Sequence, residues 1–269
     1  MLENISFGKF IPLDSFLHKM DPRFKLVLLI AIIVFIFITS NYFSLALILA
    51  FSVFLMLASK IKLKMFLSNV KPILPIIIIT AILSAIYVKT GDVLVSFWKI
   101  TIYSDAIERI VFMIVRISLL IIISSLLSYT TSPTSLTSAL ESLFSPLKYI
   151  GLKNAVHTMA MTMTIALRFI PTLIEETGKI MNAQKARGAD FESGGILKKV
   201  KALLPVLVPL LISSVRRAEE LANAMECRCY SGADGRTRYK KLSFGKRDVI
   251  ATAICVFVFA GVIVLNILL

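Results

Sequence analysis

Two arginines have surroundings that suggest a specific role in recognition. The first stands in the stretch Ala183-Gln184-Lys185-Ala186-Arg187-Gly188, and the second in Ala224-Met225-Glu226-Cys227-Arg228-Cys229. In both stretches an alanine lies four residues before the arginine, and an Ala-Asp pair follows shortly after it. A guanidinium group offers a planar fork for paired hydrogen bonds to carboxylates or carbonyls, and small neighbouring side chains let a partner's groove approach a helix closely. The repeat therefore predicts two equivalent docking sites.

Helix capping is the simpler explanation for either copy alone. A cation near a helix C-terminus is stabilised by the helix dipole by about 0.3–1 kcal/mol, and a glycine after it is an ordinary helix stop. The second occurrence, again at the end of a long helical pattern, favours recognition over capping alone.

The cysteines and histidines do not form a metal-binding pattern. Cys227 and Cys229 resemble half of a thiolate site, but Cys255 and the two histidines, His18 and His157, are remote from them in the sequence. A structural zinc site usually needs four ligands, so we expect no metal site. No glycine-lysine pair completes a phosphate-binding loop. We therefore expect the chain to be non-catalytic, with no cofactor of its own.

The composition predicts an integral membrane protein. Of 269 residues, 57% are hydrophobic, and the mean hydropathy is +0.86, whereas soluble domains are about 45–50% apolar. A helix needs about 20 apolar residues to cross a bilayer. The candidate spans are Phe24–Thr39, Phe43–Ala58, Pro72–Val88, Ile110–Leu127 and Val249–Leu269.

The positions of lysine and arginine predict the orientation in the membrane. Basic residues precede the first span, and most of the others fall within Tyr129–Arg247. Because cationic residues concentrate on the cytoplasmic side, the N-terminus and Tyr129–Arg247 should be cytoplasmic, with Lys89–Asp105 outside. This bias and attraction to anionic membrane lipid explain the net charge of +14, and we expect no nucleic-acid partner. The chain should be a multi-pass protein of the cell membrane.

The region between the fourth and last spans contains three long helical patterns. They cover Ser135–Tyr149, Asn154–Arg187 and Ile196 to about Arg228, and their apolar residues recur at spacings of three or four. Pro171 should bend or break the second pattern. These helices should lie at the cytoplasmic surface and present the two arginines at their ends.

The predicted fold class is an all-α integral membrane protein with about five transmembrane helices plus long cytoplasmic-side helices. We divide the chain into N-terminal transmembrane helices (1–128), the cytoplasmic-side region (129–247) and a C-terminal transmembrane helix (248–269). Residues 89–105 fit either a short hairpin or a surface helix.

Several stretches together resemble a known family. They are Leu17-His18-Lys19-Met20-Asp21-Pro22-Arg23-Phe24-Lys25, Arg168-Phe169-Ile170-Pro171 followed by Glu175, the stretch around Arg187, and Arg217 to Glu226 before the second arginine. In this order they resemble the transmembrane T component of energy-coupling factor (ECF) vitamin transporters.

The resemblance implies a role for each motif. In that family, two Ala-Arg-Gly motifs end the coupling helices and dock into grooves on two cytoplasmic ATPases, which use ATP. A separate integral membrane subunit binds the vitamin. By resemblance, the long cytoplasmic-side helices are the coupling helices. The docking residues would be Ala186, Arg187 and Gly188 in the first motif and Cys227, Arg228 and Cys229 in the second, supported by Ala183, Gln184, Ala224 and Glu226. Cys229 replaces a glycine and is less tolerant of left-handed backbone, which leaves the geometry of the second cap open.

Two other classes of function are weaker alternatives. A self-contained channel or secondary transporter would need a polar pathway at mid-membrane depth, and the first three spans carry almost no ionisable residues. A membrane enzyme acting on lipid should show a clustered acid-base or metal constellation, and the sequence contains none.

Overall fold

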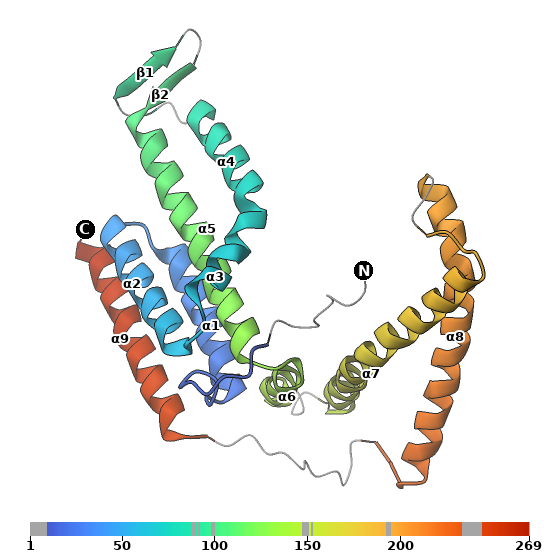
Figure 1. The fold of residues 1–269 in the computed structure, drawn as a ribbon. Coiled ribbons are helices and arrows are strands. Elements are labelled where there is room, and N and C mark those ends of the chain that lie inside the picture. Colours follow the sequence, from blue (N-terminus) through green and yellow to red (C-terminus); the bar gives the residue numbers. More distant parts are fainter. Residues whose placement is uncertain are drawn as a thin grey trace. The chain divides into compact units, whose positions relative to one another are not determined.

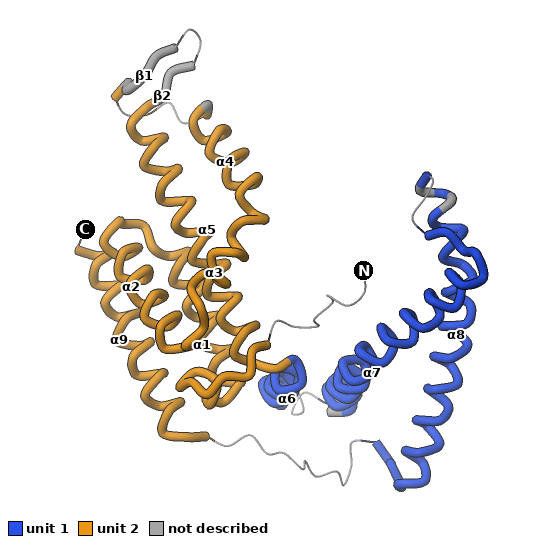
Figure 2. Tube along the Cα trace, in the orientation of Figure 1, with its two compact units in different colours: residues 1–7, 133–241 blue, residues 8–132, 242–269 orange. Residues whose placement is uncertain are grey.

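The protein consists of two compact units of helices (Figures 1 and 2). The computed structural model describes residues 10–87, 90, 92–97, 100–146, 151, 153–191, 195–232 and 244–268. We call residues 8–132 together with 242–269 the membrane unit. Residues 133–241, grouped with 1–7, form the three-helix unit.

The membrane unit contains most of the apolar helices and one pair of strands. Its elements are α1 (Pro22–Ile38), α2 (Tyr42–Ser59), α3 (Leu63–Val70), the 3-10 turn η2 (Lys71–Ile73), α4 (Leu74–Tyr87), β1 (Val93–Phe97), β2 (Ile100–Tyr103), α5 (Ser104–Thr130) and α9 (Lys246–Leu268).

Among the described residues, four helical stretches are long and apolar enough to cross a membrane. They are Tyr42–Ser59, Leu63–Ala85, Ser104–Thr130 and Lys246–Leu268. The all-α membrane fold is thus confirmed, and four of the five predicted spans have the required length. Helix α1 has 17 residues, at the lower limit of the range of about 17–25 residues for a membrane-spanning helix. The third span begins earlier than predicted, because Pro72 fits into the 3-10 turn between α3 and α4.

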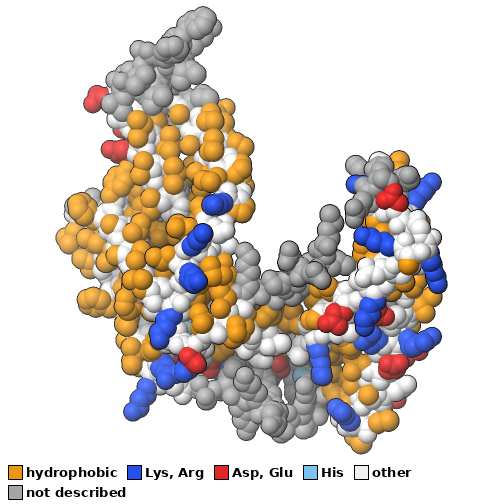
Figure 3. Space-filling model, viewed as in Figure 1, with side chains coloured by type: hydrophobic (Ala, Val, Ile, Leu, Met, Phe, Trp, Pro, Cys, Tyr) orange, Lys and Arg blue, Asp and Glu red, His pale blue; other side chains and the backbone are white. Residues whose placement is uncertain are grey.

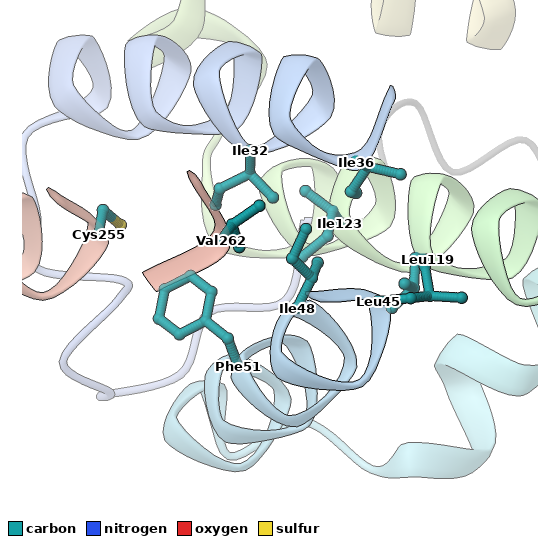
Figure 4. Packing of buried hydrophobic residues seen from close by; sticks show 9 residues of the cluster. All are labelled: Ile32, Ile36, Leu45, Ile48, Phe51, Leu119, Ile123, Cys255 and Val262. Carbon is teal, nitrogen blue, oxygen red and sulfur yellow. The ribbon is translucent and has the colours of Figure 1, made fainter. Parts of the chain in front are cut away.

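Helix α1 is held in the membrane unit by apolar packing. Its residues Ile32 and Ile36 are buried with Ile48 of α2, Ile123 of α5 and Val262 of α9 (Figure 4). Ring stacking between Phe35 of α1 and Phe259 of α9, with centroids 4.1 Å apart, adds to the same contact. In a bilayer, such contacts stabilise by van der Waals packing rather than by removing apolar surface from water, and this packing holds α1 against α2, α5 and α9.

The two ends of the membrane unit are chemically different. At one end, which we call the turn end, the Ser44 hydroxyl donates to Asn266 Oδ1 (3.0 Å) and the Tyr42 hydroxyl donates to Glu108 (3.4 Å). At the other end, the basic end, Lys25 Nζ donates to the Thr130 carbonyl (3.0 Å). Lysines and arginines precede α1, follow α2 and begin α9 at the basic end, and Figure 3 shows basic side chains over the lower part of this unit.

Buried Asp248 fixes the start of α9 at the basic end. Its carboxylate accepts hydrogen bonds from the backbone N–H groups of Gly245 and Asp21, each at 2.9 Å. The bond to Gly245 is one half of a capping box, and the bond to Asp21 ties α9 to the start of α1. Asp21 itself caps α1 by accepting from the Arg23 N–H, as expected for an Asp-Pro helix start.

The segment between α4 and α5 is a β-hairpin, which decides between the two structures that the sequence left open. Strands β1 and β2 are antiparallel, with Val93 opposite Tyr103 and Phe97 opposite Ile100. The Ser104 N–H donates to the Asp92 carbonyl at 2.9 Å. Helix α5 therefore begins directly after β2, six residues earlier than the predicted start at Ile110.

The three-helix unit consists of α6 (Pro133–Leu143), α7 (Lys153–Ala186) and α8 (Ile196–Glu226). Helix α7 packs against both of the others. At 34 and 31 residues, α7 and α8 are about 51 and 46 Å long. Pro171 was predicted to bend or break the helix, and a break is wrong, because α7 runs through this residue without interruption. A proline lacks the N–H that would bond to the carbonyl group four residues earlier in the helix. Because Pro171 is exposed, this missing bond does not lie in the protein core.

Candidate functional site

Helix α7 ends in a complete C-terminal cap around Arg187. The Gly188 N–H donates to the Lys185 carbonyl (2.9 Å), and the Ala189 N–H reaches back to the Gln184 carbonyl (3.0 Å). Gly188 adopts a left-handed conformation with φ of 88°. These two bonds and the left-handed residue are those of a Schellman motif. Arg187 is thus fixed as the residue immediately before the reversal of the chain.

Helix α8 ends in the same way around Arg228. The Cys229 N–H donates to the Glu226 carbonyl (2.9 Å), and the Tyr230 N–H reaches back to the Met225 carbonyl (3.1 Å). Cys229 is left-handed with φ of 55°. The hydrogen-bond pattern matches that of the first cap residue for residue, so Arg228 occupies the position that Arg187 has in α7.

This equivalence answers the question that Cys229 raised in the sequence. A side chain with a Cβ atom in left-handed backbone costs roughly 1–2 kcal/mol, yet Cys229 adopts the conformation that Gly188 adopts without strain. The two backbone hydrogen bonds of the cap outweigh this cost, because an unfolded cap would leave helix carbonyls unpaired. The second motif therefore keeps the shape of the first without its glycine.

Both arginines are exposed and available to a partner. Neither guanidinium forms a hydrogen bond or ion pair with another residue in the described part of the chain. Of the residues predicted to surround them, Ala186, Gly188, Cys227 and Cys229 are exposed. The predicted supporting residues Ala183, Ala224 and Glu226 are exposed too, whereas Gln184 donates a hydrogen bond to the Pro205 carbonyl of α8 (3.4 Å).

Contacts along α7 and α8 show that these helices are antiparallel. Near the start of α7, His157 Nε2 lies 3.4 Å from the hydroxyl of Tyr230, which follows the end of α8. Near the end of α7, Gln184 contacts Pro205 in the first part of α8. The Arg187 cap and the Arg228 cap therefore lie at opposite ends of the helix pair (Figure 1), separated by roughly the helix length of 45 Å.

A polar cluster joins α7 to α8 near the middle of the pair. Arg217 Nη2 lies 2.8 Å from Glu176 Oε2, the Ser213 hydroxyl donates to the same carboxylate, and the Arg217 guanidinium lies 6.0 Å from the Phe169 ring centroid. Sequence reasoning missed Glu176 and named its exposed neighbour Glu175 instead. Helical spacing relative to Phe169 was the available signal, since residues seven apart share one helix face.

The three cysteines and the histidines are not assembled around a common point. Cys227 and Cys229 are exposed free thiols at the end of α8, whereas Cys255 is buried in α9. Among the described residues, no group of three or more His, Cys, Asp or Glu side chains is arranged to hold a metal ion.

The fold and the two caps together define a multi-pass membrane protein that presents two equivalent arginine-bearing helix ends. Comparison with known proteins identifies the family within this class. The family model described as "CbiQ: Cobalt transport protein" matches residues 14–239. The chain belongs to this family, which includes the transmembrane T components of ECF transporters, and the resemblance inferred from the sequence motifs is confirmed.

Curated relatives match along nearly their whole length. A protein of Ruminiclostridium cellulolyticum is 46% identical over 266 residues, covering 99% of this chain and 98% of the relative. One of Clostridium kluyveri is 45% identical over 267 residues, with the same coverage. One of Lactococcus lactis subsp. cremoris is 40% identical over 247 residues, covering 92% of each chain. Each is named energy-coupling factor transporter transmembrane protein EcfT.

Proposed function

We propose that this chain is the coupling subunit of an ECF-type importer. In this role, Arg187 docks on one cytoplasmic ATPase and Arg228 docks on a second. The motion that ATP drives in the ATPases passes through α7 and α8 to a separate membrane subunit that binds a vitamin. The observation that carries the proposal is the pair of matching caps, each with an exposed guanidinium free to bind a partner.

The opposite placement of the caps supports docking to two separate partners. Two sites about 45 Å apart are too distant for one small groove, but each can engage its own ATPase. A carboxylate or a set of carbonyl groups in each ATPase groove would accept paired hydrogen bonds from the guanidinium. Because the arginines lie outside the regular helices, the small residues beside them permit close approach of the groove walls.

The polar cluster at Glu176 supports mechanical coupling between the two docking sites. Its hydrogen bonds join α7 to α8 between the caps, so a displacement at either cap moves both helices. ATP is bound and hydrolysed by the partner ATPases in this scheme, and the chain itself contributes no catalytic group. The chain transmits motion from the ATPases through α7 and α8.

One apolar face of α8 supports binding of the vitamin-binding subunit. Large hydrophobic side chains recur along it at helical spacing, and all are exposed: Leu197, Val200, Leu204, Val208, Leu211 and Val215. An exposed apolar stripe of this length marks a protein or membrane contact. We assign it to the substrate-binding membrane subunit, with the exposed Met159 and Met163 of α7 as adaptable neighbours.

The proposed orientation follows from the basic end of the membrane unit. Lysines and arginines before α1, after α2 and at the start of α9 occupy this end. By the positive-inside rule, the basic end and the N-terminus face the cytoplasm. The chain leaves the membrane unit after α5 and re-enters it before α9 at residues of this same end, which supports a cytoplasmic location for residues 129–247.

Single and double arginine variants test the docking role. We would purify the complex after co-expression of the chain with both ATPases and the substrate-binding subunit, and measure its mass and vitamin uptake. Arg187→Ala and Arg228→Ala should each release one ATPase and reduce the complex from two ATPases to one. Loss of a hydrogen-bonded charge costs about 1.5–3 kcal/mol, or roughly 10- to 150-fold in affinity. The double variant should retain neither ATPase.

Arg216→Ala is the matched control, because it removes an exposed arginine from the same helix pair without touching either cap. It should leave ATPase content and uptake unchanged. Arg187→Lys keeps the charge but loses the planar fork, so it should weaken docking nearly as much as Arg187→Ala. Unchanged co-purification and uptake in the Arg187→Ala, Arg228→Ala double variant would refute the proposed role of both caps.

A further inference from the structure

A cavity of about 340 Å³ lies inside the basic half of the membrane unit. Four helices contribute to its wall, namely α1, α2, α5 and α9, and the segment before α1 contributes Phe16, Leu17 and Met20. Its volume is at the lower end of the range of about 300–1,000 Å³ for small-molecule sites. The cavity is not used by the coupling role proposed above.

Helices α2 and α9 contact each other near the turn end. There, a Cβ atom on Gly261 of α9 would lie 3.2 Å from Leu47 of α2, and Ser44 of α2 bonds to Asn266 of α9. Towards the basic end, both helices line the cavity, and Phe54 of α2 and Ile250 of α9 are also exposed at the surface. The cavity therefore opens sideways between α2 and α9.

Helices α1 and α5 form the other side of the cavity. Helix α1 contacts α9 through Phe35 against Phe259 (4.1 Å between ring centroids), and Phe24 of α1 contacts Phe244 just before α9 (5.0 Å). Helix α1 also packs against α5. The inner end of the cavity is formed by Ile32, Phe51, Ile123 and Cys255, which all belong to the packed cluster shown in Figure 4. The distance from Lys25 to Ile32 along α1 gives a depth of about 10 Å.

The chemistry of the wall fits a hydrocarbon chain. Apart from Lys25 and Thr130 at the basic end, all lining residues are apolar. A polar cargo such as a vitamin would find almost no hydrogen-bond partners inside, and buried polar groups without partners are costly. In a membrane, the abundant molecule with a long apolar chain is a phospholipid.

The charge at the opening indicates the type of phospholipid. Lys60 follows the end of α2, and Lys246 and Arg247 begin α9, so exposed basic residues flank both sides of the opening. The nearby carboxylate of Asp248 is already occupied by two backbone N–H groups. Lys25 is only 8% exposed, and its ammonium donates to Thr130 and Thr131. Its third N–H has no partner among the described residues and can bind an ester or phosphate oxygen.

We propose that this cavity binds one acyl chain of an anionic glycerophospholipid from the leaflet at the basic end. The chain enters between α2 and α9 and ends beside Cys255, and the phosphate lies among Lys60, Lys246 and Arg247. The bound lipid fills the wedge between the two helices and so becomes part of the packed core of the membrane unit.

Native mass spectrometry of the full chain, purified in mild detergent, tests the proposal. The protein would be titrated with phosphatidylglycerol or with phosphatidylcholine of the same acyl chains. We expect one tightly held phosphatidylglycerol and at least tenfold weaker phosphatidylcholine binding. The cavity-filling variants Ala58→Phe and Ala251→Phe should bind phosphatidylglycerol at least tenfold more weakly. Ala46→Phe and Ala253→Phe place the same side chain at exposed positions of α2 and α9 and should bind as the wild type does.

Two further measurements test the anionic selectivity and the position of the acyl chain separately. Neither requires that the cavity-filling variants fold. The Lys246→Gln, Arg247→Gln double variant changes only exposed residues and should lose about tenfold in preference for the anionic lipid. In the unaltered chain, phosphatidylglycerol with a photoreactive group at its acyl end should label Ile32, Phe51, Ile123 or Cys255. Equal lipid binding by the filled variants, or labelling confined to outward-facing residues such as Phe257, would overturn the proposed site. Equal binding of the two lipids would overturn its anionic selectivity.

Discussion

The left-handed residue in each cap provides a direct test of the structural equivalence of the two helix ends. We consider the exchange of residues Cys229→Gly and Gly188→Cys, which gives each cap the residue of the other. A Cβ atom built on Gly188 meets no atom within 4 Å among the described residues. The effect of Gly188→Cys should therefore come from backbone strain alone and not from a steric clash.

The expected magnitude follows from two opposing contributions. Left-handed backbone costs a residue with a Cβ atom roughly 1–2 kcal/mol, whereas glycine loses about 0.4–1 kcal/mol more conformational entropy on folding. Cys229→Gly should therefore stabilise its cap by about 0.5–1 kcal/mol, and Gly188→Cys should destabilise the other cap by the same amount. Either change alters the local opening equilibrium by about two- to fivefold.

Amide hydrogen exchange at the caps measures these changes. The reporters are the N–H groups of Ala189 and Tyr230, which donate the long-range bond of each cap (3.0 and 3.1 Å). Gly188→Cys should accelerate exchange at Ala189, and Cys229→Gly should slow it at Tyr230, while Ala222 within α8 stays unchanged as a control. Faster exchange at Tyr230 in Cys229→Gly would show that Cys229 is not strained and that the two caps differ.

Two other outcomes follow from the described contacts. Glu176→Gln removes the ion pair with Arg217 and should destabilise the chain by about 1.5–3 kcal/mol, seen as a lower Tm, whereas Glu175→Gln at the exposed neighbouring position should leave the Tm unchanged. Burial lowers the pKa of the His18 imidazole below its usual 6.5 and favours the neutral ring, which lies 2.9 Å from the Ile11 carbonyl. The stability from this neutral ring is complete above pH 6.5 and is lost as the pH falls towards the lower folded pKa. The Tm of the wild type should fall more steeply with acidification than that of His18→Gln, and parallel pH profiles would contradict this explanation.

The sequence predicted the fold class and the chemical type of the candidate site because both depend on local patterns. Long apolar runs identify helices that can cross a membrane, and Asp21 before Pro22 marks the start of α1, which the structure confirms. The spacing around Arg187 and Arg228 placed both at helix ends, and they lie there. Their binding to ATPases remains a prediction.

Other features depended on contacts between distant residues and were missed or left open. The choice of a hairpin for residues 93–103 depends on strand pairing, and apolar residues at these short spacings fit both structures. Pro171 was expected to interrupt a helix, but packing along α7 outweighs its local effect. Glu176 could not be distinguished from Glu175 until the position of α8 was known.

Hydropathy and local spacing are properties of consecutive residues, so the amino-acid sequence was enough to predict a helical membrane protein with two arginine motifs. The antiparallel pairing of α7 and α8, the wide separation of their caps and the cavity lined by α2 and α9 appear only in the structure. The physical reason is that helix pairing depends on side-chain packing between residues separated by tens of positions. The left-handed backbone of Cys229, which the sequence left open, also appears only in the structure.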